Sequence, residues 1–524
     1  MQADLEQIPA ELKETFARLL AEHKRLVDER DQIQADKLRF QSENKILREQ
    51  LRLLRLEKYG PRSEKLSDGQ LDLLDKEPSV VAAEVENESN QPPITEPPAK
   101  KPKRKHPGRV DLPAHLERRE IKIACAPEAC VCPHCQMEKQ VIGYERSEEL
   151  DVIPAYYFVK VTLREKRACP RHPEAGVNTA PCPERILPKS KLSDATIVDV
   201  LVKKYGDFLP AYRQSMILER DAQIELSRKT LVSVILKAGE LLKALIPGLK
   251  ADLFSGKYIQ ADETPIDCQS QATPGRNHRA YLWEFGRPNG PVIFDFRMSR
   301  AREGPKEFLN GFRGFLQSDG YGAYAQLGEG IDYLACWAHA RRDFHKAHLL
   351  QKLDKRPVEI LDLIGQMYEV EKQAREKGLS PSERLAARQE LSRPILDKIR
   401  ERILVLKGEA DFLPASQLGR ACNYTLKLWD RLELFLKHGE LEIDNNQCEN
   451  SIRPLAVGRK NWLHIGSEQA GPLVAAIASI FETCRRLKIN PRDYLLDVLP
   501  RIAEWPASRV AELSPVAWKA KRAS

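Results

Sequence analysis

The sequence has little that would place the protein in a membrane or outside the cell. Its longest strongly apolar window, residues 472–481, spans ten positions, whereas a membrane-spanning helix needs about 20. The N-terminus lacks the succession of basic, apolar and small residues that marks a signal peptide. We therefore expect a cytoplasmic protein that has no membrane partner.

Cysteines are few and odd in number, and basic residues exceed acidic residues by only a small margin. The chain has 11 cysteines and a formal net charge of +8. Without an export signal the thiols should stay reduced, so clustered cysteines are interpreted as metal ligands before disulfides. The charge by itself does not identify a nucleic-acid-binding protein. Residues 100–109 nevertheless hold six basic side chains, a pattern that fits either a solvated linker or a segment that contacts DNA.

With 524 residues, the chain is too long for a single core and should form several domains. Near the N-terminus, apolar residues recur at seven-residue intervals, which predicts a helix with a coiled-coil seam. The second seam position is mixed and includes Asn44, so a long solvated helix remains an alternative. The residues of the apolar series are Leu12, Leu19, Leu26, Ile33, Phe40, Leu47 and Leu54.

The periodicity changes several times along the rest of the chain. Residues 156–163 have the composition of a strand, and helices are predicted at 194–204, 212–220 and 226–245, the last with Ser227 as its N-cap. These helices resemble a helix-turn-helix, although ordinary helical packing would give the same pattern. Strands follow at 258–266, 281–286, 292–297, 314–318 and 331–336, and a basic helix is predicted at 337–346. Beyond a helical stretch, further helices are predicted at 444–453 and 473–487.

Three acidic residues lie on these predicted elements at positions where they could form one catalytic site. Asp262 lies inside an apolar strand, Asp319 ends a later strand, and Glu449 lies near the start of a helix. A buried acid is costly unless it binds a metal or a partner. If the three converge, they form an all-oxygen site suited to two Mg²⁺ or Mn²⁺ ions, which serve phosphoryl transfer. A lone acid at a strand end is usually a turn former, so the prediction depends on all three together.

Several motifs around these acids resemble the insertion-sequence-66 family of bacterial DDE transposases. The motifs, in chain order, are Ile259-Gln-Ala-Asp-Glu-Thr264, Gln317-Ser-Asp-Gly-Tyr-Gly-Ala-Tyr324, Cys336-Trp-Ala-His-Ala-Arg-Arg342, Asp444-Asn-Asn-Gln-Cys-Glu-Asn-Ser-Ile-Arg-Pro454 and Ala456-Val-Gly-Arg-Lys-Asn-Trp-Leu463. The resemblance spans nearly the whole chain. It implies that Asp262, Asp319 and Glu449 are the catalytic, metal-binding triad, and that Cys336 and His339 support the site.

The resemblance also implies a multidomain α+β fold with an RNase H-like α/β catalytic core that contains a helical insertion. A coiled coil, a zinc-binding ribbon and a helix-turn-helix-like DNA-binding domain would precede the core. The expected domains are a coiled coil at 1–58, a linker at 59–109, a zinc-binding domain at 110–188, a helical DNA-binding domain at 189–250, the first part of the core at 251–346, the helical insertion at 347–440, the second part of the core at 441–485 and a C-terminal helical tail at 486–524.

Two short cysteine motifs predict a structural zinc site. Cys132 and Cys135 form a C-x₂-C pair, and Cys169 and His172 form a C-x₂-H pair further along. Tetrahedral Zn²⁺ takes four such ligands, commonly two from each of two short loops. The family that the chain resembles generally has cysteine as the fourth zinc ligand, so His172 is the ligand whose assignment needs a test. The competing residues are His134, Cys125, Cys130 and Cys182.

The implied activity is Mg²⁺-dependent cleavage at the 3′ ends of an insertion sequence, followed by transfer of those ends to target DNA. Such a protein would bind the terminal inverted repeats and act near the nucleoid as a dimer or higher oligomer, with companion proteins of the element as further partners. The alternatives are an RNase H-like nuclease without strand transfer and an inactive DNA-binding regulator. The candidate DNA contacts are Arg213, Arg228, Lys229, Arg453, Arg459 and Lys460.

Overall fold

The computed structural model describes residues 10–59, 157–168, 177–181, 184–188, 190–270, 276–502 and 504–523. One compact unit comprises Met1–Leu74 with Lys160–Ser524, and a second comprises Asp75–Val159. Nearly all of the second unit lies outside the described residues. The predicted zinc ligands Cys132, Cys135, Cys169 and His172 and the basic tract 100–109 also lie outside the described residues.

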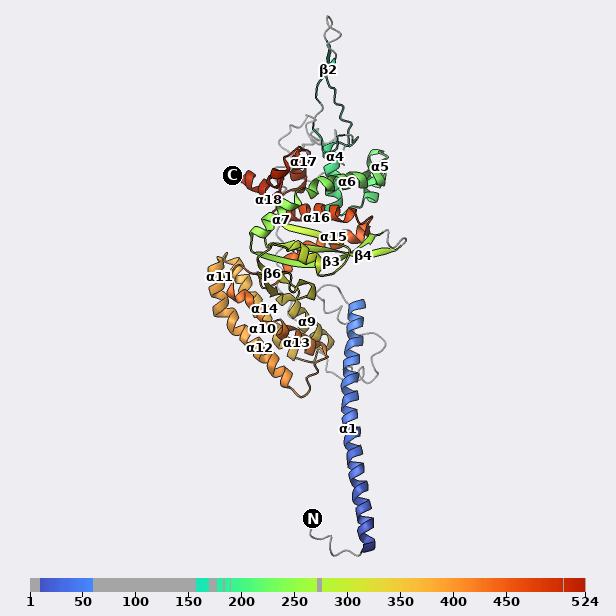
Figure 1. The fold of residues 1–524 in the computed structure, drawn as a ribbon, viewed down its shortest axis with the longest axis vertical. Coiled ribbons are helices and arrows are strands. Elements are labelled where there is room, and N and C mark those ends of the chain that lie inside the picture. The colour runs from blue at the N-terminus through green and yellow to red at the C-terminus, as the bar shows by residue number, and fades with distance from the viewer. Residues whose placement is uncertain are drawn as a thin grey trace, which may run out of the picture. The chain divides into compact units, whose positions relative to one another are not determined.

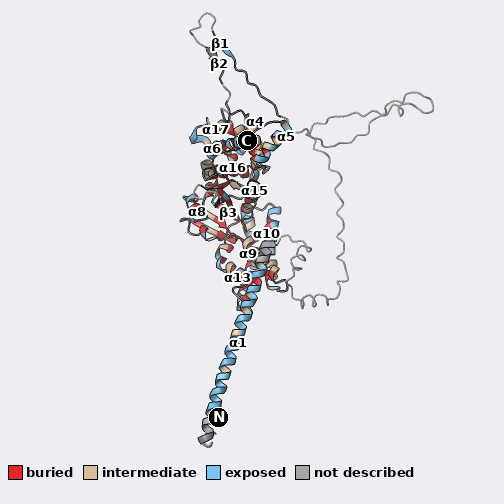
Figure 2. Cartoon of the chain, turned by 90° about the vertical axis from the view of Figure 1, so that its right-hand side faces the viewer, coloured by how far each residue is buried: buried red, intermediate tan, exposed pale blue. Residues whose placement is uncertain are grey.

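The N-terminal repeat forms a single helix, α1 (Ala10–Tyr59). Figure 2 shows most of this helix as exposed. Five residues of its seven-residue series are between 52% and 62% exposed: Leu19, Leu26, Ile33, Phe40 and Leu47. The helical prediction is confirmed for this stretch, and its apolar seam is uncovered in the single chain.

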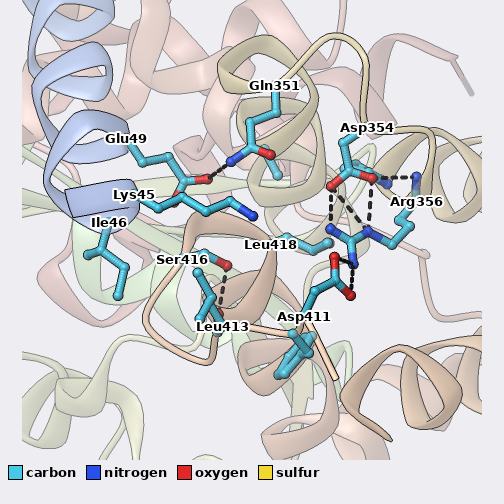
Figure 3. Close-up of a pocket in the computed structure, with 13 residues that line it drawn as sticks. Lys45, Ile46, Glu49, Gln351, Asp354, Arg356, Asp411, Leu413, Ser416 and Leu418 are labelled. Atoms are coloured by element: carbon cyan, nitrogen blue, oxygen red, sulfur yellow. Dashed lines mark hydrogen bonds and ion pairs between the residues drawn. The ribbon is translucent and has the colours of Figure 1, made fainter. Parts of the chain in front are cut away.

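Towards its C-terminal end, α1 contacts the helical part of the same unit. The carboxylate of Glu49 accepts hydrogen bonds from Nε2 of Gln351 at 3.1 Å and from the backbone N of Gln417 at 3.0 Å. Gln417 is the first residue of α13 (Gln417–Lys427), and the dipole of a helix favours a negative charge at this end. A small polar pocket opens beside this contact, with Lys45, Asp354 and Arg356 among its walls (Figure 3).

A helical domain precedes the sheet. It consists of α4 (Asp194–Tyr205), α5 (Ala211–Ala222), α6 (Arg228–Lys243) and α7 (Ile246–Ser255). The hydroxyl of Ser227 accepts a hydrogen bond from the backbone N of Thr230 at 3.2 Å, which confirms the predicted N-cap. One side of α6 packs against α16 (Ala470–Arg486), and its first turn is exposed.

A mixed sheet lies at the centre of the unit (Figure 1). Its strands are β3 (Tyr258–Gln269), β4 (Asn277–Gly286), β5 (Val292–Arg297), β6 (Gly314–Ser318) and β7 (Ile331–Ala335), joined by the short β8 (His464–Ile465). The order is β5-β4-β3-β6-β7, and β8 pairs with β3. The β3-β4-β5 pairs are antiparallel, whereas β3-β6 and β6-β7 are parallel.

Alternate residues of β3 enter two different cores, as the period of a strand requires. Ile266 and Cys268 pack with α15 (Asn446–Trp462) and α16. Ile259 and Ala261 pack on the opposite face, in a core that also takes residues of α7, α8 (Glu303–Phe308) and the 3₁₀ turn η3 (Gly322–Tyr324). Figure 1 shows α15 and α16 together on one side of the sheet.

The chain between β7 and α15 is mostly helical and builds a third core, which also takes Tyr258 of β3 and Leu334 and Ala335 of β7. Its elements are α9 (Trp337–Leu350), α10 (Arg356–Glu376), α11 (Pro381–Ala387), a π-helical turn η4 (Arg388–Ser392), α12 (Arg393–Gly408), α13, α14 (Trp429–Glu433) and the 3₁₀ turn η5 (Leu434–Lys437). This arrangement agrees with the predicted helical stretch between the second and third acids.

The remaining elements include one difference from the prediction. α17 (Pro491–Ile502), the 3₁₀ helix η6 (Ala507–Leu513) and α18 (Pro515–Ala523) close the chain. The strand predicted at 156–163 is wrong for its described part, since residues 157–163 are not in a strand; a hairpin of β1 (Lys166–Ala168) and β2 (Val177–Thr179) follows instead. Among the described residues, no helix is long and apolar enough to cross a membrane.

Candidate active site

The strand register places the first two acids at the same level of the sheet. β3 and β6 run parallel, with Tyr258 opposite Phe315 and Gln260 opposite Gln317. Residue numbers in each pair differ by 57, the same difference that separates Asp262 from Asp319. Asp319 follows directly after the end of β6, so the two acids lie at neighbouring strand positions.

Asp262 occupies a partly buried position on the face of β3 that α15 covers. Its Oδ1 accepts a hydrogen bond from the backbone N of Glu263 at 2.8 Å. Burial raises the pKa of Asp262 to about 8, and the charges of Glu263, Asp319 and Glu449 add to the effect. The charges of Asp319 and Glu449 thus act on Asp262, while a metal site shared by the three acids stays a prediction.

Asp319 is held by its own turn and by the helical insertion. Its Oδ1 accepts a hydrogen bond from the backbone N of Tyr321 at 2.8 Å, and its backbone O accepts one from the hydroxyl of Tyr424 at 2.6 Å. The next residue, Gly320, has a φ of +87°, and a Cβ there would meet Leu428 Cδ1 at 2.8 Å. The backbone angle therefore favours glycine at this turn, and a larger residue would also displace the end of the Leu428 side chain.

Glu449 lies in the first turn of α15, where the helix dipole favours an acid. This helix begins at Asn446, later than the predicted start at Asp444, and continues to Trp462. Nη2 of Arg342 donates to both Glu449 carboxylate oxygens, at 3.2 and 3.3 Å, and His339 Nε2 lies 3.6 Å from Oε1. Burial and the nearby Arg342 charge lower the pKa of His339.

The Cys336–His339 motif contacts the segment that carries the third acid. Cys336 is buried, and its Sγ accepts a hydrogen bond from the backbone N of Asn445 at 3.4 Å. The backbone N of Trp337 donates to the backbone O of Ile443 at 3.2 Å. The start of α9 thus lies against the start of α15, and His339 comes within reach of Glu449 from the same helix.

The chemistry of these side chains suits a divalent cation, although they do not form a closed cluster. In the part of the chain that the structure describes, no three His, Cys, Asp or Glu side chains gather tightly enough to hold a metal ion. Burial, and after it the negative charges of Glu263, Asp319 and Glu449, nevertheless raise the pKa of Asp262. A cation bound there would relieve this repulsion, so the three carboxylates fit Mg²⁺ as ligands.

The predicted DNA contacts fall into two groups. Five are exposed: Arg213 on α5, Arg228 and Lys229 at the start of α6, and Arg453 and Lys460 on α15. Arg459 differs, because its Nη1 donates to Oγ1 of Thr264 at 3.1 Å and to the backbone O of Pro265. These bonds attach α15 to β3, so Arg459 has a structural partner that sequence reasoning did not anticipate.

Sequence reasoning also missed the polar residues that surround the acids. Arg342 contacts Glu449 from α9 and Tyr424 contacts Asp319 from α13, and their spacing in the sequence gives no sign of this. Gln260 and Gln317 are fully buried in apolar strands, each two residues before an acid. The Gln-x-Asp pattern that both strands share could have identified these glutamines, because a polar residue inside a buried strand needs an explanation.

The chain is similar to proteins of mobile elements over most of its length. A family model described as "Transposase IS66 family" matches residues 189–472. Shorter models match 46–121 ("Transposase C of IS166 homeodomain"), 129–171 ("zinc-finger binding domain of transposase IS66") and 479–516 ("IS66 C-terminal element"). The zinc-finger match includes Cys132, Cys135 and Cys169 and ends one residue before His172.

Curated relatives come from Sinorhizobium fredii. The uncharacterized protein y4qI is 32% identical over 488 residues, which cover 89% of this chain and 87% of the relative. The uncharacterized protein y4jD is 34% identical over 431 residues, covering 78% of this chain and 82% of the relative. The similarity therefore extends well beyond the region of the three acids.

Proposed function

Because the chain belongs to the IS66 family of transposases, we propose that it cleaves DNA at the ends of its own insertion sequence and joins the freed 3′ ends to target DNA. A transposase acts on nucleic acid, and the proposal concerns how this one does so. The observation that carries it is the strand register, which sets Asp319, directly after β6, level with Asp262 on β3, with Glu449 on the helix that packs on β3.

The arrangement of the acids supports an RNase H-like core. Such a core needs one acid on a central strand, one at the end of a neighbouring strand and one on a helix packed beside them. Asp262 is on the central β3, Asp319 follows the parallel β6, and Glu449 is on α15, which packs on β3. The helices from α10 to η5 lie within residues 347–440, where we propose the helical insertion.

We propose that these three carboxylates hold Mg²⁺ or Mn²⁺. When bound, such ions activate the attacking oxygen and stabilise the leaving oxygen of a phosphodiester. Arg342 and His339 lie beside Glu449; there they limit where its carboxylate can point and offer positive charge or hydrogen bonds to a DNA phosphate. Water, and then a DNA 3′-hydroxyl, can attack at the same site without a covalent bond to the protein.

The other parts of the chain serve to hold DNA and to pair protomers. The zinc-finger match supports a structural Zn²⁺, for which Cys132, Cys135, Cys169 and His172 are the proposed ligands. Exposed basic residues on α5, α6 and α15 are proposed to bind the phosphate backbone of the inverted repeats. The uncovered seam of α1 suits a homodimer that keeps two element ends together. We place this work at the bacterial nucleoid, with companion proteins of the element as further partners.

The test uses purified full-length protein and duplexes that carry the inverted repeats flanking the gene. With Mg²⁺ we expect nicks that free the 3′ ends, and with precleaved ends we expect joining to a plasmid. Nicking without joining would identify a nuclease. Binding to the repeats with neither reaction would identify a regulator.

A further inference from the structure

A cluster of buried polar side chains lies in the sheet next to the acids and has no role in the proposed chemistry. Gln260 and Gln317 are 0% exposed, and Tyr258 is 7% exposed. Burial of an amide or hydroxyl costs about 1–3 kcal/mol when its hydrogen bonds are lost. What these side chains bond to therefore indicates what they do.

The two glutamines join the strands that carry the first two acids. Nε2 of Gln260 donates to Oε1 of Gln317 at 2.9 Å, and the hydroxyl of Tyr258 donates to the same oxygen. Nε2 of Gln260 also lies 3.1 Å from the Tyr258 hydroxyl. These side-chain bonds add to the backbone pairing of β3 with β6 two residues before Asp262 and Asp319.

The remaining bonds of the cluster reach the segment that leads to the third acid. Nε2 of Gln260 donates to the backbone O of Asp444 at 2.8 Å, and Nε2 of Gln317 donates to the backbone O of Glu442 at 2.9 Å. The backbone N of Glu442 donates to the Tyr258 hydroxyl at 3.2 Å. Since α15 begins at Asn446, the cluster holds the chain a few residues before Glu449.

The side-chain donors of this cluster all have acceptors. The amide nitrogen of Gln260 has two protons for three nearby acceptors, and its Oε1 has no partner among the described residues. The side chain of Glu442 is fixed separately, by Arg384 of α11 at 2.7 Å. The segment at 442–444 is thus held between the sheet on one side and the helical insertion on the other.

We propose that Gln260 and Gln317 are positioning residues that set the distance of Glu449 from the two strand acids and so make a shared metal site possible. The inference rests on the proposed function, in which the three acids bind metal together. Metal ligands must be placed to within about 0.5 Å, and residues that only support ligands commonly change metal affinity by about 10–100-fold. The three acids lie on separate elements, and this cluster contacts all of those elements or the chain leading into them.

The test compares Gln260→Met and Gln317→Met with Gln214→Met. Methionine has nearly the size of glutamine but cannot donate hydrogen bonds. Gln214 is a matched control because it is 2% exposed and its Nε2 also donates to two backbone oxygens, those of Val200 at 3.2 Å and Leu209 at 3.0 Å. Tyr258→Phe is a milder variant that removes only the hydroxyl.

Two readouts separate positioning from a general loss of stability. The first is the rise in melting temperature on titration with Mn²⁺ alone, measured against a sample in EDTA. The second is the Mg²⁺ concentration for half-maximal cleavage of a duplex element end. All three methionine variants should lose stability in EDTA, but only Gln260→Met and Gln317→Met should need about tenfold more metal. Tyr258→Phe should need an intermediate amount.

Unchanged metal dependence in Gln260→Met and Gln317→Met would overturn the proposal, and if these two do not fold, unchanged dependence in Tyr258→Phe would do so. The Mn²⁺ readout does not require activity. Wild-type protein that responds to Mn²⁺ but leaves DNA uncut would refute the proposed function, while the comparison of variants still decides the positioning role. A wild type without any Mn²⁺ response would overturn the positioning role together with the metal site.

Discussion

Arg486 on α16 donates a hydrogen bond from Nη2 to Oε1 of Glu284 on β4 at 2.8 Å, and the side chains are only 7% and 0% exposed. Glu284 stands opposite Asp262 in the pairing of β3 with β4. The same Arg486 nitrogen donates to the backbone O of Gln447, in the first turn of α15, at 2.9 Å. This ion pair therefore connects the strand beside the first acid with the helix of the third.

Replacing Arg486 by methionine should destabilise the fold strongly. The change leaves the Glu284 carboxyl buried without its partner, which typically costs about 3–5 kcal/mol. Arg509→Met is the control: Arg509 pairs with Glu512, the two side chains are 60% and 35% exposed, and such a pair is worth about 0–1 kcal/mol. Urea unfolding followed by fluorescence measures both variants, and equal losses would contradict the assigned role of the buried pair.

Asp262→Asn, Asp319→Asn and Glu449→Gln should each lower cleavage of element ends by more than about 100-fold. Each change removes a proposed metal ligand. Metal ions lower the activation free energy of such reactions by several kcal/mol, and each 1.36 kcal/mol corresponds to a tenfold change in rate. Binding to the repeats should persist in a gel-shift assay. Asp267→Asn, an exposed acid on the same strand, is the control and should stay active. Full activity in any triad variant would remove that residue from the site.

The pH dependence of stability should contain a contribution from Lys204, whose Nζ lies 5.8 Å from the ring centroid of Tyr205 and 5.5 Å from that of Trp462. Burial lowers the pKa of Lys204 from 10.5 to about 8. Between these values the unfolded chain holds a proton that the folded chain has lost, so the free energy of unfolding rises with pH from about 8 to about 10.5. Lys204→Met should abolish this rise.

The same variant should be more stable than the wild type at pH 7, because it buries no charge. The shift in the pKa of Lys204 sets an upper limit of about 3 kcal/mol on this gain in stability. The loss of the cation–π contacts offsets part of the gain. The difference should vanish above about pH 10.5. Unfolding at a series of pH values measures it, and parallel curves for the two proteins would show that Lys204 is not desolvated.

Dimerisation should depend on the exposed seam of α1. Leu26→Lys with Ile33→Lys places two charges on residues that are 58% and 62% exposed in the single chain, which would disrupt a coiled-coil interface. Light scattering should show a dimer for the wild type and a monomer for this variant. Gln34→Lys, beside the seam, should remain dimeric. A monomeric wild type at micromolar concentration would contradict the prediction.

Purified protein should contain one Zn²⁺ per chain. Cys132→Ser or Cys135→Ser should lose the metal, because four protein ligands are needed for a structural site. His172→Ala should also lose the Zn²⁺, whereas His134→Ala should retain it. Elemental analysis distinguishes these outcomes, and zinc retained in His172→Ala would assign the fourth place to one of the competing cysteines.

Much of the fold around the site was predictable from local pattern. The strands 292–297 and 314–318 and the N-cap Ser227 agree with the structure, because apolar alternation and capping depend on neighbours in the sequence. β3 continues three residues beyond its predicted end, to Gln269, and α15 runs through Pro454. Pairing with β4 and packing on the sheet extended these elements, which the local pattern could not indicate.

The sequence by itself determined the identity and order of the three acids and the kind of element that carries each. Only the tertiary structure decided how these elements are held together. The glutamine cluster joins residues up to 184 positions apart, Arg342 meets Glu449 across 107, and Arg459 bonds to β3 across 195. Contacts over such distances depend on how helices pack against the sheet, and no local periodicity encodes which polar side chain will meet which backbone oxygen.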